Sequence, residues 1–154
     1  MARLQEISKN LSAYLDMISV SEGTHGHGDD GYNILVGGTT FHDYSKHPNI
    51  IVTLNPRLKS TAAGRYQILA RYAKAYSKML GLKDFTPESQ DRIAIQYIKE
   101  RHALEDIEAG RIESAIKRCR SVWASFPGAG YGQHEHKIGR LLVAFADAKS
   151  GRLA

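Results

Sequence analysis

The sequence predicts one α+β domain, in which a helical majority stands beside a small antiparallel sheet. Apolar residues recur at the three- and four-residue spacing of buried helix faces along most of the chain, whereas only two short apolar runs have the character of strands. A chain of 154 residues with 42% hydrophobic residues has the size of one domain and can bury a core. No internal repeat or low-complexity segment divides it, so we expect residues 1–154 to form a single domain.

The first predicted helix carries an apolar stripe between Ile7 and Ile18, at i, i+4, i+7 and i+8 spacing. Gly23 then offers the left-handed conformation that commonly ends a helix. A polar loop rich in glycine follows. The apolar runs 34–36 and 49–54 are expected to be the strands, because the first enters a Gly-Gly turn and the second stops before a proline.

Two start signals predict later helices. Ser60 and Thr61 are candidate N-caps, because their hydroxyl groups can accept hydrogen bonds from free backbone N–H groups. Thr86 followed by Pro87 is a second signal, since proline is well tolerated at the first helical position. Buried helical stripes are expected over residues 68–80, 93–98, 112–119 and 138–145.

Cys119 is the only cysteine, so the chain cannot form a disulfide within itself. It continues a stripe with Ile112, Ala115 and Ile116, which favours a buried thiol that acts as a small hydrophobe over a nucleophile. Tyr66 and Trp123 are expected to pack in the core as well.

Charge and hydropathy restrict the possible partners. Twenty-one Lys and Arg residues against sixteen Asp and Glu residues give a net charge of +5. This excess suits an anionic partner, either nucleic acid or a bacterial cell wall with its carboxylated peptides and lactyl ethers, but it also serves solubility alone. The N-terminus has no apolar signal region, and no apolar run approaches 18 residues, so we expect a soluble product of the cytoplasm without stable membrane insertion.

Glu22 is the residue whose position most strongly suggests chemistry. It stands four residues after Ile18 and therefore falls on the buried side of the first helix. A carboxyl group at the rim of a core is partly desolvated, which raises its pKa toward the range that a general acid needs near neutral pH. Spacing alone allows a solvated residue at a helix end equally well.

A series of ordered segments from about Leu15 to about Lys137 carries the most specific signal in the chain, because long ordered matches are more specific than any short motif. The segments are Tyr32–Gly38, Phe41, Asp43–Ser45, His47–Pro48, Val52–Pro56, Leu58–Gln67, Leu80–Phe85, Ser89–Asp91, Ile98–Arg101, Ala103–Leu104, Trp123–Ser125 and Pro127–Gln133. Together they resemble the lambda-type family of phage endolysins, which are lytic transglycosylases.

The resemblance implies a lysozyme-like fold in which the small sheet flanks an active-site cleft. It also implies cleavage of the β-1,4 bond between MurNAc and GlcNAc in peptidoglycan, with Glu22 of the Ser-Glu-Gly turn as the catalytic acid. A transglycosylase needs only this carboxyl group, which protonates the glycosidic oxygen and then accepts the proton of the substrate's 6-hydroxyl, giving a 1,6-anhydromuramic product. No cofactor and no metal ion is expected.

Peptidoglycan glycan strands are the partner that the resemblance implies, and nucleic acid is not expected. The enzyme would be a monomer that is made in the host cytoplasm. It would reach the cell wall from the periplasmic side after a holin has opened the inner membrane, and cause host lysis.

Two segments have the composition of sugar-binding sites. Ser60–Gln67 places hydroxyl groups and small residues at an expected helix start, where a substrate can approach free backbone N–H groups. Pro127–Gln133 is a glycine-rich loop with an exposed Tyr131, and it resembles one lip of the family's cleft, while Asn55–Ser60 resembles the other. The expected substrate-binding residues are Tyr32, Asn33, Ser60, Thr61, Gln67, Tyr131 and Gln133.

A hydrolytic muramidase acting on the same bond is the main alternative. Hydrolysis normally uses a second carboxylate, which activates water or traps the oxocarbenium ion. Asp29, Asp30 and Asp43 are available for this role, although the sequence favours solvated loop positions for all three.

Two further alternatives have weaker support. The pairs His25 with His27 and His134 with His136 are metal ligands by residue type, but neither belongs to a complete ligand set at a recognised spacing. A non-catalytic module that binds cell wall or nucleic acid would explain the net charge but not the position of Glu22.

Overall fold

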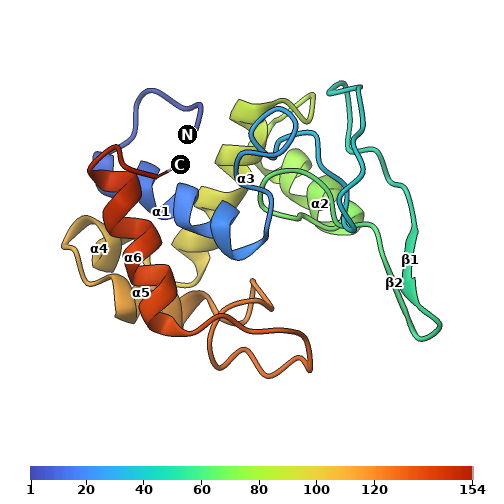
Figure 1. The fold of residues 1–154 in the computed structure, drawn as a ribbon. Coiled ribbons are helices and arrows are strands. Elements are labelled where there is room, and N and C mark those ends of the chain that lie inside the picture. Colours follow the sequence, from blue (N-terminus) through green and yellow to red (C-terminus); the bar gives the residue numbers. More distant parts are fainter. Residues whose placement is uncertain (154) are drawn as a thin grey trace. The chain divides into compact units, whose positions relative to one another are not determined.

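The structure is a computed structural model that describes residues 1–153. Within this range the chain divides into two compact units. The helical unit comprises residues 1–23 and 94–153, and the hairpin unit comprises residues 24–93. The elements are α1 (Lys9–Ser21), β1 (Val52–Asn55), β2 (Leu58–Ser60), α2 (Ala70–Leu80), α3 (Pro87–Glu100), α4 (Leu104–Glu108), α5 (Ile112–Cys119) and α6 (Ile138–Lys149) (Figure 1). Helices beside a small antiparallel sheet confirm the predicted α+β class, whereas the single domain over residues 1–154 stays a prediction.

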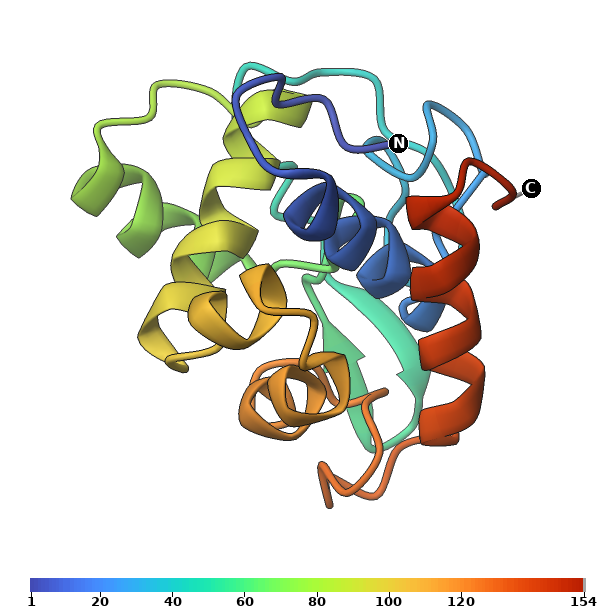
Figure 2. The ribbon, with the colours of Figure 1, turned by 90° about the vertical axis from the view of Figure 1, so that its left-hand side faces the viewer.

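The helical unit is built around α1, which packs along α6 (Figures 1 and 2). The Ser8 hydroxyl caps α1 by accepting a hydrogen bond of 3.0 Å from the Leu11 N–H. The predicted stripe is confirmed from Leu11 to Ile18, which are buried, whereas Ile7 lies before the helix and is partly exposed. α4 also packs against α1, so two other helices of the unit hold α1 in place.

Cys119 at the end of α5 is fully buried, as predicted. Burial raises the pKa of its thiol to about 11. Trp123 packs in the same unit with its ring centroid 5.6 Å from that of Phe126. These aromatic rings are almost fully buried, which confirms the expectation that Trp123 is a core residue.

The hairpin unit contains the sheet, in which β1 and β2 pair antiparallel with an irregularity between Thr53 and Asn55. β1 confirms a strand in the run 49–54, although it begins only at Val52. The strand expected over 34–36 is wrong: Ile34 and Leu35 form only isolated bridges. Gly37 and Gly38 follow with φ angles of 89° and 102°, so the chain turns back before a ladder can form.

The prediction that Ser60 and Thr61 begin a helix is also wrong. Ser60 ends β2, and α2 starts only at Ala70. Between them, Gly64 and Gln67 have φ angles of 82° and 52°, and these left-handed positions interrupt any helix. The Thr61 hydroxyl still acts as a cap, because it accepts a hydrogen bond of 3.0 Å from the N–H at the start of α2.

α2 does not bury the stripe expected over 68–80. Ala73 is its only buried residue, whereas Tyr72 and Met79 are 43% and 59% exposed. α3 agrees better with its prediction, since it begins at Pro87 and the Thr86 hydroxyl lies 3.4 Å from the Ser89 N–H.

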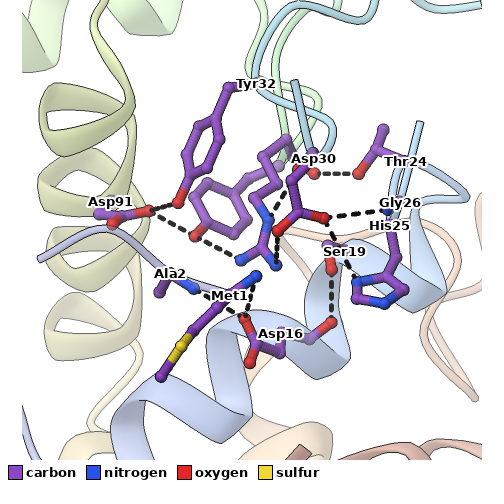
Figure 3. Close-up of polar contacts among 12 residues, drawn as sticks. Met1, Ala2, Asp16, Ser19, Thr24, His25, Gly26, Asp30, Tyr32 and Asp91 are labelled. Carbon is purple, nitrogen blue, oxygen red and sulfur yellow. Dashed lines mark hydrogen bonds and ion pairs between the residues drawn. The ribbon is translucent and has the colours of Figure 1, made fainter. Parts of the chain in front are cut away.

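A buried polar network forms the centre of the hairpin unit. The Arg65 side chain is fully buried, and its Nε donates to the Asp30 carbonyl at 3.0 Å while Nη2 lies 3.3 Å from Asp30 Oδ2. Nη1 donates to the Tyr66 hydroxyl at 3.2 Å, which in turn donates to Asp91 Oδ1 at 2.5 Å. The Tyr32 hydroxyl donates to the same oxygen at 2.7 Å (Figure 3). The buried guanidinium is thus connected to two carboxyl groups and two rings, which lowers the cost of removing it from water.

Replacing Asp91 should destabilise the protein strongly. Asp91→Ala removes the acceptor of two buried hydroxyl groups and leaves the guanidinium with less negative charge nearby, so we expect a loss of about 3 kcal/mol in the free energy of unfolding. Urea unfolding of the variant and the wild type at pH 7 measures this loss. Asp147→Ala is the matched control, because the Asp147 side chain is 38% exposed and its ion pair with Arg152 spans 4.0 Å, so its loss should change stability by about 0.5 kcal/mol or less. Equal effects of the two substitutions would contradict a stabilising network.

Candidate active site

Glu22 occupies the C-cap of α1, so its carboxyl group lies at the carboxyl end of that helix. Its N–H donates to the Ile18 carbonyl at 2.8 Å, and Gly23 follows with a φ angle of 74°, as predicted. The residue is half-buried. Burial disfavours the charged form of this carboxyl group, and the partial negative charge of a helix C-terminus acts in the same direction.

These surroundings keep Glu22 protonated near neutral pH. Burial raises the pKa of its carboxyl group to about 8, against an opposing hydrogen bond from Ser125. The Ser125 hydroxyl donates to Glu22 Oε1 over 3.4 Å, a long and weak contact, and lies 2.6 Å from the Ser21 hydroxyl. The site therefore holds a proton on Glu22 and keeps one hydroxyl donor ready for the carboxylate that forms when the proton leaves.

His136 contacts the same helix end from the irregular segment just before α6. Its Nε2 lies 2.9 Å from the Ser21 carbonyl oxygen, so this nitrogen carries the hydrogen and donates. Burial lowers the pKa of His136, which makes the neutral ring the form present at pH 7. His136 therefore has a hydrogen-bonding role, and within residues 1–153 no three His, Cys, Asp or Glu side chains group as metal ligands.

The loop Pro127–Gln133 is tied by Glu135, whose two carboxylate oxygens each accept a backbone N–H at 3.0 Å, from Gly128 and Gly130. The hydrogen bond from Gly130 lowers the pKa of Glu135 most, and the bond from Gly128 adds to this effect. The Glu135 carboxylate therefore stays ionised at neutral pH. Tyr131 is 56% exposed, as expected, while its hydroxyl donates to the Ser121 carbonyl at 2.8 Å. Gln133 is exposed on the same loop. The loop thus presents one aromatic face to solvent from an anchored backbone.

Tyr32 does not offer a surface to a sugar. Its ring is fully buried, and its hydroxyl is bonded to Asp91. The sequence-based assignment of Tyr32 as a substrate-binding residue is therefore corrected: it is a core residue of the hairpin unit. Its rigid ring also lies 5.3 Å from the Arg65 guanidinium, an attractive cation–π arrangement.

The other four expected binding residues of the hairpin unit shape its backbone. Asn33 Oδ1 accepts the Asp29 N–H at 2.8 Å, and the Ser60 hydroxyl accepts the Ala62 N–H at 3.1 Å. The Gln67 amide donates to the carbonyl groups of residues 34 and 64, and Thr61 caps α2. All four are partly exposed, so a substrate role for Asn33, Ser60, Thr61 and Gln67 stays a prediction.

Two of the three aspartates considered as second carboxylates have structural partners. Asp30 pairs with the buried Arg65, and Asp29 accepts a hydrogen bond of 2.7 Å from the Tyr44 hydroxyl, so both are half-buried loop residues with structural partners. Asp43 is exposed, as expected, and its pKa is lowered by the N–H of Ser45.

Sequence reasoning missed the groups that surround Glu22. Ser125 and His136 lie more than 100 residues away along the chain, and neither has a local pattern that would mark it. Ser125 does fall within one of the segments that carry the family resemblance, which is the one signal that could have identified it.

The helical fold with its two-stranded sheet, together with a carboxyl group held protonated at a helix end, defines a lysozyme-like enzyme. The chain belongs to the Endolysin family, whose pattern matches residues 12–152. It is 55% identical to the endolysin of Escherichia phage lambda over 147 residues, which cover 93% of each chain. It is 50% identical to the endolysin of Escherichia phage P2 over 153 residues, covering 91% of this chain and 93% of that one.

Comparison with solved structures shows the same relationship at the level of the fold. The lysozyme of bacteriophage lambda in complex with a chitohexasaccharide superposes with a TM-score of 0.91 at 54% identity, covering 94% of this chain and 97% of that one. A second structure of that lysozyme gives a TM-score of 0.86 over the same shares of the two chains. The lysozyme-like fold predicted from the sequence is therefore confirmed. Among residues 1–153, no helix is both long and apolar enough to span a bilayer.

The raised pKa of Glu22 predicts a specific dependence of stability on pH. Because the native pKa of about 8 lies above the ordinary value of 4.5, the native state binds the proton more tightly than the unfolded state, and stability falls as pH rises between these values. Glu22→Gln removes this dependence. The free energy of unfolding of the variant minus that of the wild type should therefore rise by about 1.4 kcal/mol per pH unit between pH 4.5 and about 8. Urea unfolding at several pH values tests this, and a difference that does not vary with pH would contradict the raised pKa.

Proposed function

We propose that this protein is a lytic transglycosylase that cleaves the MurNAc-GlcNAc β-1,4 bond of peptidoglycan, with Glu22 as its catalytic acid and base. The observation that carries the proposal is a single carboxyl group whose pKa is raised to about 8, so that it enters the reaction with its proton. Membership of the Endolysin family supports the substrate class. The lambda lysozyme that binds a chitohexasaccharide supports a glycan with β-1,4-linked N-acetyl sugars.

In the first step Glu22 donates its proton to the glycosidic oxygen as the bond to the anomeric carbon breaks. Positive charge then develops on the sugar ring, and the carboxylate that remains on Glu22 stabilises it. The Ser125 hydroxyl can move closer to Oε1 once the carboxylate is charged, because hydrogen bonds to ionised acceptors are shorter and stronger.

In the second step the 6-hydroxyl of the muramic ring attacks its own anomeric carbon. Glu22 accepts the hydroxyl proton, which restores the acid and yields the 1,6-anhydro sugar. Both proton transfers use the same group, so no second carboxylate is needed. Within the helical unit, burial raises the pKa of Glu22, and the hydrogen bond from Ser125 lowers it. No carboxylate of that unit contributes to this pKa.

The proposed enzyme acts as a monomer and without a cofactor. It meets peptidoglycan in the periplasm after a holin has permeabilised the inner membrane. Exposed residues that could contact the glycan are Tyr131 and Gln133 on the loop tied by Glu135, and the partly exposed Asn33, Ser60, Thr61 and Gln67 of the hairpin unit.

The product decides between transglycosylation and hydrolysis. We expect digestion of purified sacculi to release muropeptides with anhydromuramic ends, which mass spectrometry detects as species lighter by one water than reducing ends. Glu22→Gln should lower the rate of release by about 10²- to 10⁴-fold, since glutamine cannot deliver a proton. Reducing ends as the main product would identify a hydrolytic muramidase, and a folded Glu22→Gln variant with near wild-type activity would exclude Glu22 as the acid.

Tyr131 is expected to stack on a sugar ring. Tyr131→Ala should slow lysis several-fold and change the unfolding free energy by about 0.5 kcal/mol or less, because the ring is largely exposed. Tyr131→Phe is the matched control, since it removes only the hydroxyl bond to the Ser121 carbonyl and keeps the ring. If Ala lowers stability by several kcal/mol while activity per folded molecule is unchanged, Tyr131 is a packing residue instead.

A further inference from the structure

The hairpin unit contains a cavity of about 510 Å³ to which neither the proposed chemistry nor the expected substrate residues assign a role. It lies where residues 45–49, which precede β1, and one side of α2 between Ala70 and Ser77 meet the segment 82–85 that precedes α3. None of the residues expected to bind the glycan lines it. The cavity is therefore a candidate site in its own right.

One wall of the cavity is apolar and fixed. Phe85 is almost fully buried, and the ring of His47 lies 4.9 Å from it, centroid to centroid. His47 Nε2 donates to the Ile68 carbonyl at 2.8 Å, and Nδ1 accepts the Asn49 N–H at 2.9 Å, so both ring nitrogens are occupied. Burial lowers the pKa of His47 and leaves it neutral. Leu82 and the side of α2 complete the apolar part of the lining.

The rim is basic. Lys46, Lys74 and Lys83 all line the cavity, and all are exposed. In the part of the chain that the structure describes, none of the three forms an ion pair within 4.0 Å. Three lysines in one lining give it a local excess of positive charge, which favours an anionic ligand.

The acidic groups nearby do not neutralise this rim. Asp84 is the one carboxylate of the lining, and it accepts hydrogen bonds from the Ser89 and Thr86 hydroxyls at 2.5 and 2.8 Å. These bonds lower its pKa and hold it toward the start of α3. Asp43 lies outside the lining and accepts the Ser45 N–H, although it also interacts with Lys46 at longer range. The lining itself carries three positive charges against one negative charge.

We propose that this cavity binds the carboxylate-bearing peptide stems of peptidoglycan, as an anchoring site separate from the glycan chemistry. The proposal rests on the proposed function for its choice of substrate. A short peptide with several carboxylates combines aliphatic segments, which fit the wall of Phe85 and Leu82, with anionic groups that match the three lysines. A phosphate group fits less well, since the cavity far exceeds its size and offers no arginine for bidentate contacts.

Titration calorimetry with the stem tripeptide L-Ala-γ-D-Glu-meso-diaminopimelate tests the site without any glycan. Wild-type protein should bind the tripeptide with an affinity that falls as salt rises. Lys74→Gln should weaken binding about two- to fivefold, as expected for one exposed ion pair. The triple variant Lys46→Gln/Lys74→Gln/Lys83→Gln should weaken it about tenfold or more. Lys78→Gln is the matched control on the same helix, because Lys78 is exposed but does not line the cavity, and it should stay within about twofold.

A second control separates a site from general charge. A variant with Lys9, Lys78 and Lys149 changed to Gln has the same net charge as the cavity variant, and it should bind the tripeptide like the wild type. No binding by the wild type, or equal losses in both triple variants, would overturn the proposal. Inorganic phosphate that competes with the tripeptide at equal concentration would overturn it in favour of a phosphate site.

The outcome is independent of the reaction mechanism. The Glu22→Gln variant should bind the tripeptide as tightly as the wild type, because Glu22 does not line the cavity. If sacculi yield no anhydromuramic products while the tripeptide still binds at the lysines, the proposed function fails and the anchoring site stands. If products form but the tripeptide does not bind, the anchoring site fails alone.

Discussion

The end of α1 is the constraint on which the chemistry of this molecule depends. Helix formation continues as far as Ser21, and the left-handed conformation of Gly23 then directs the chain out of the helical unit. Glu22 lies between these two positions as the C-cap of α1, where burial raises the pKa of its carboxyl group. The packing that fixes α1 against α6 therefore also fixes the electrostatic environment of a single proton.

A second ionisable group, the fully buried Arg65 guanidinium, organises the hairpin unit in a different way. Glu22 avoids the cost of burial by remaining neutral, whereas Arg65 cannot lose its proton and has to be compensated where it lies. Asp30 provides a direct partner, and the Tyr66 hydroxyl relays the interaction to Asp91. This unit has one two-stranded ribbon and much irregular backbone, so such a network supplies part of the order that a larger sheet would otherwise give.

The sequence predicted well those features that depend on local chemistry and on periodicity. The stripe of α1, the glycine that ends it and the Thr86–Pro87 start of α3 are all present. It failed where the result depends on contacts between distant segments. Thr61 has the chemistry of a cap, but the helix that it caps starts nine residues later, because left-handed residues intervene. Tyr32 has a side chain suited to sugar contact, but Asp91 holds it in the core. The contacts at the end of α1 were hidden for the same reason, since Ser125 reaches Glu22 and His136 reaches the Ser21 carbonyl only through tertiary packing.

The burial of Cys119 has a consequence for the proposed route from cytoplasm to periplasm. These compartments differ in redox potential, and a thiol that is exposed in the reducing cytoplasm is open to oxidation outside it. Here the only thiol of the chain is enclosed, and its pKa of about 11 keeps it in the unreactive protonated form. In the folded protein this thiol is therefore protected from disulfide formation in either environment.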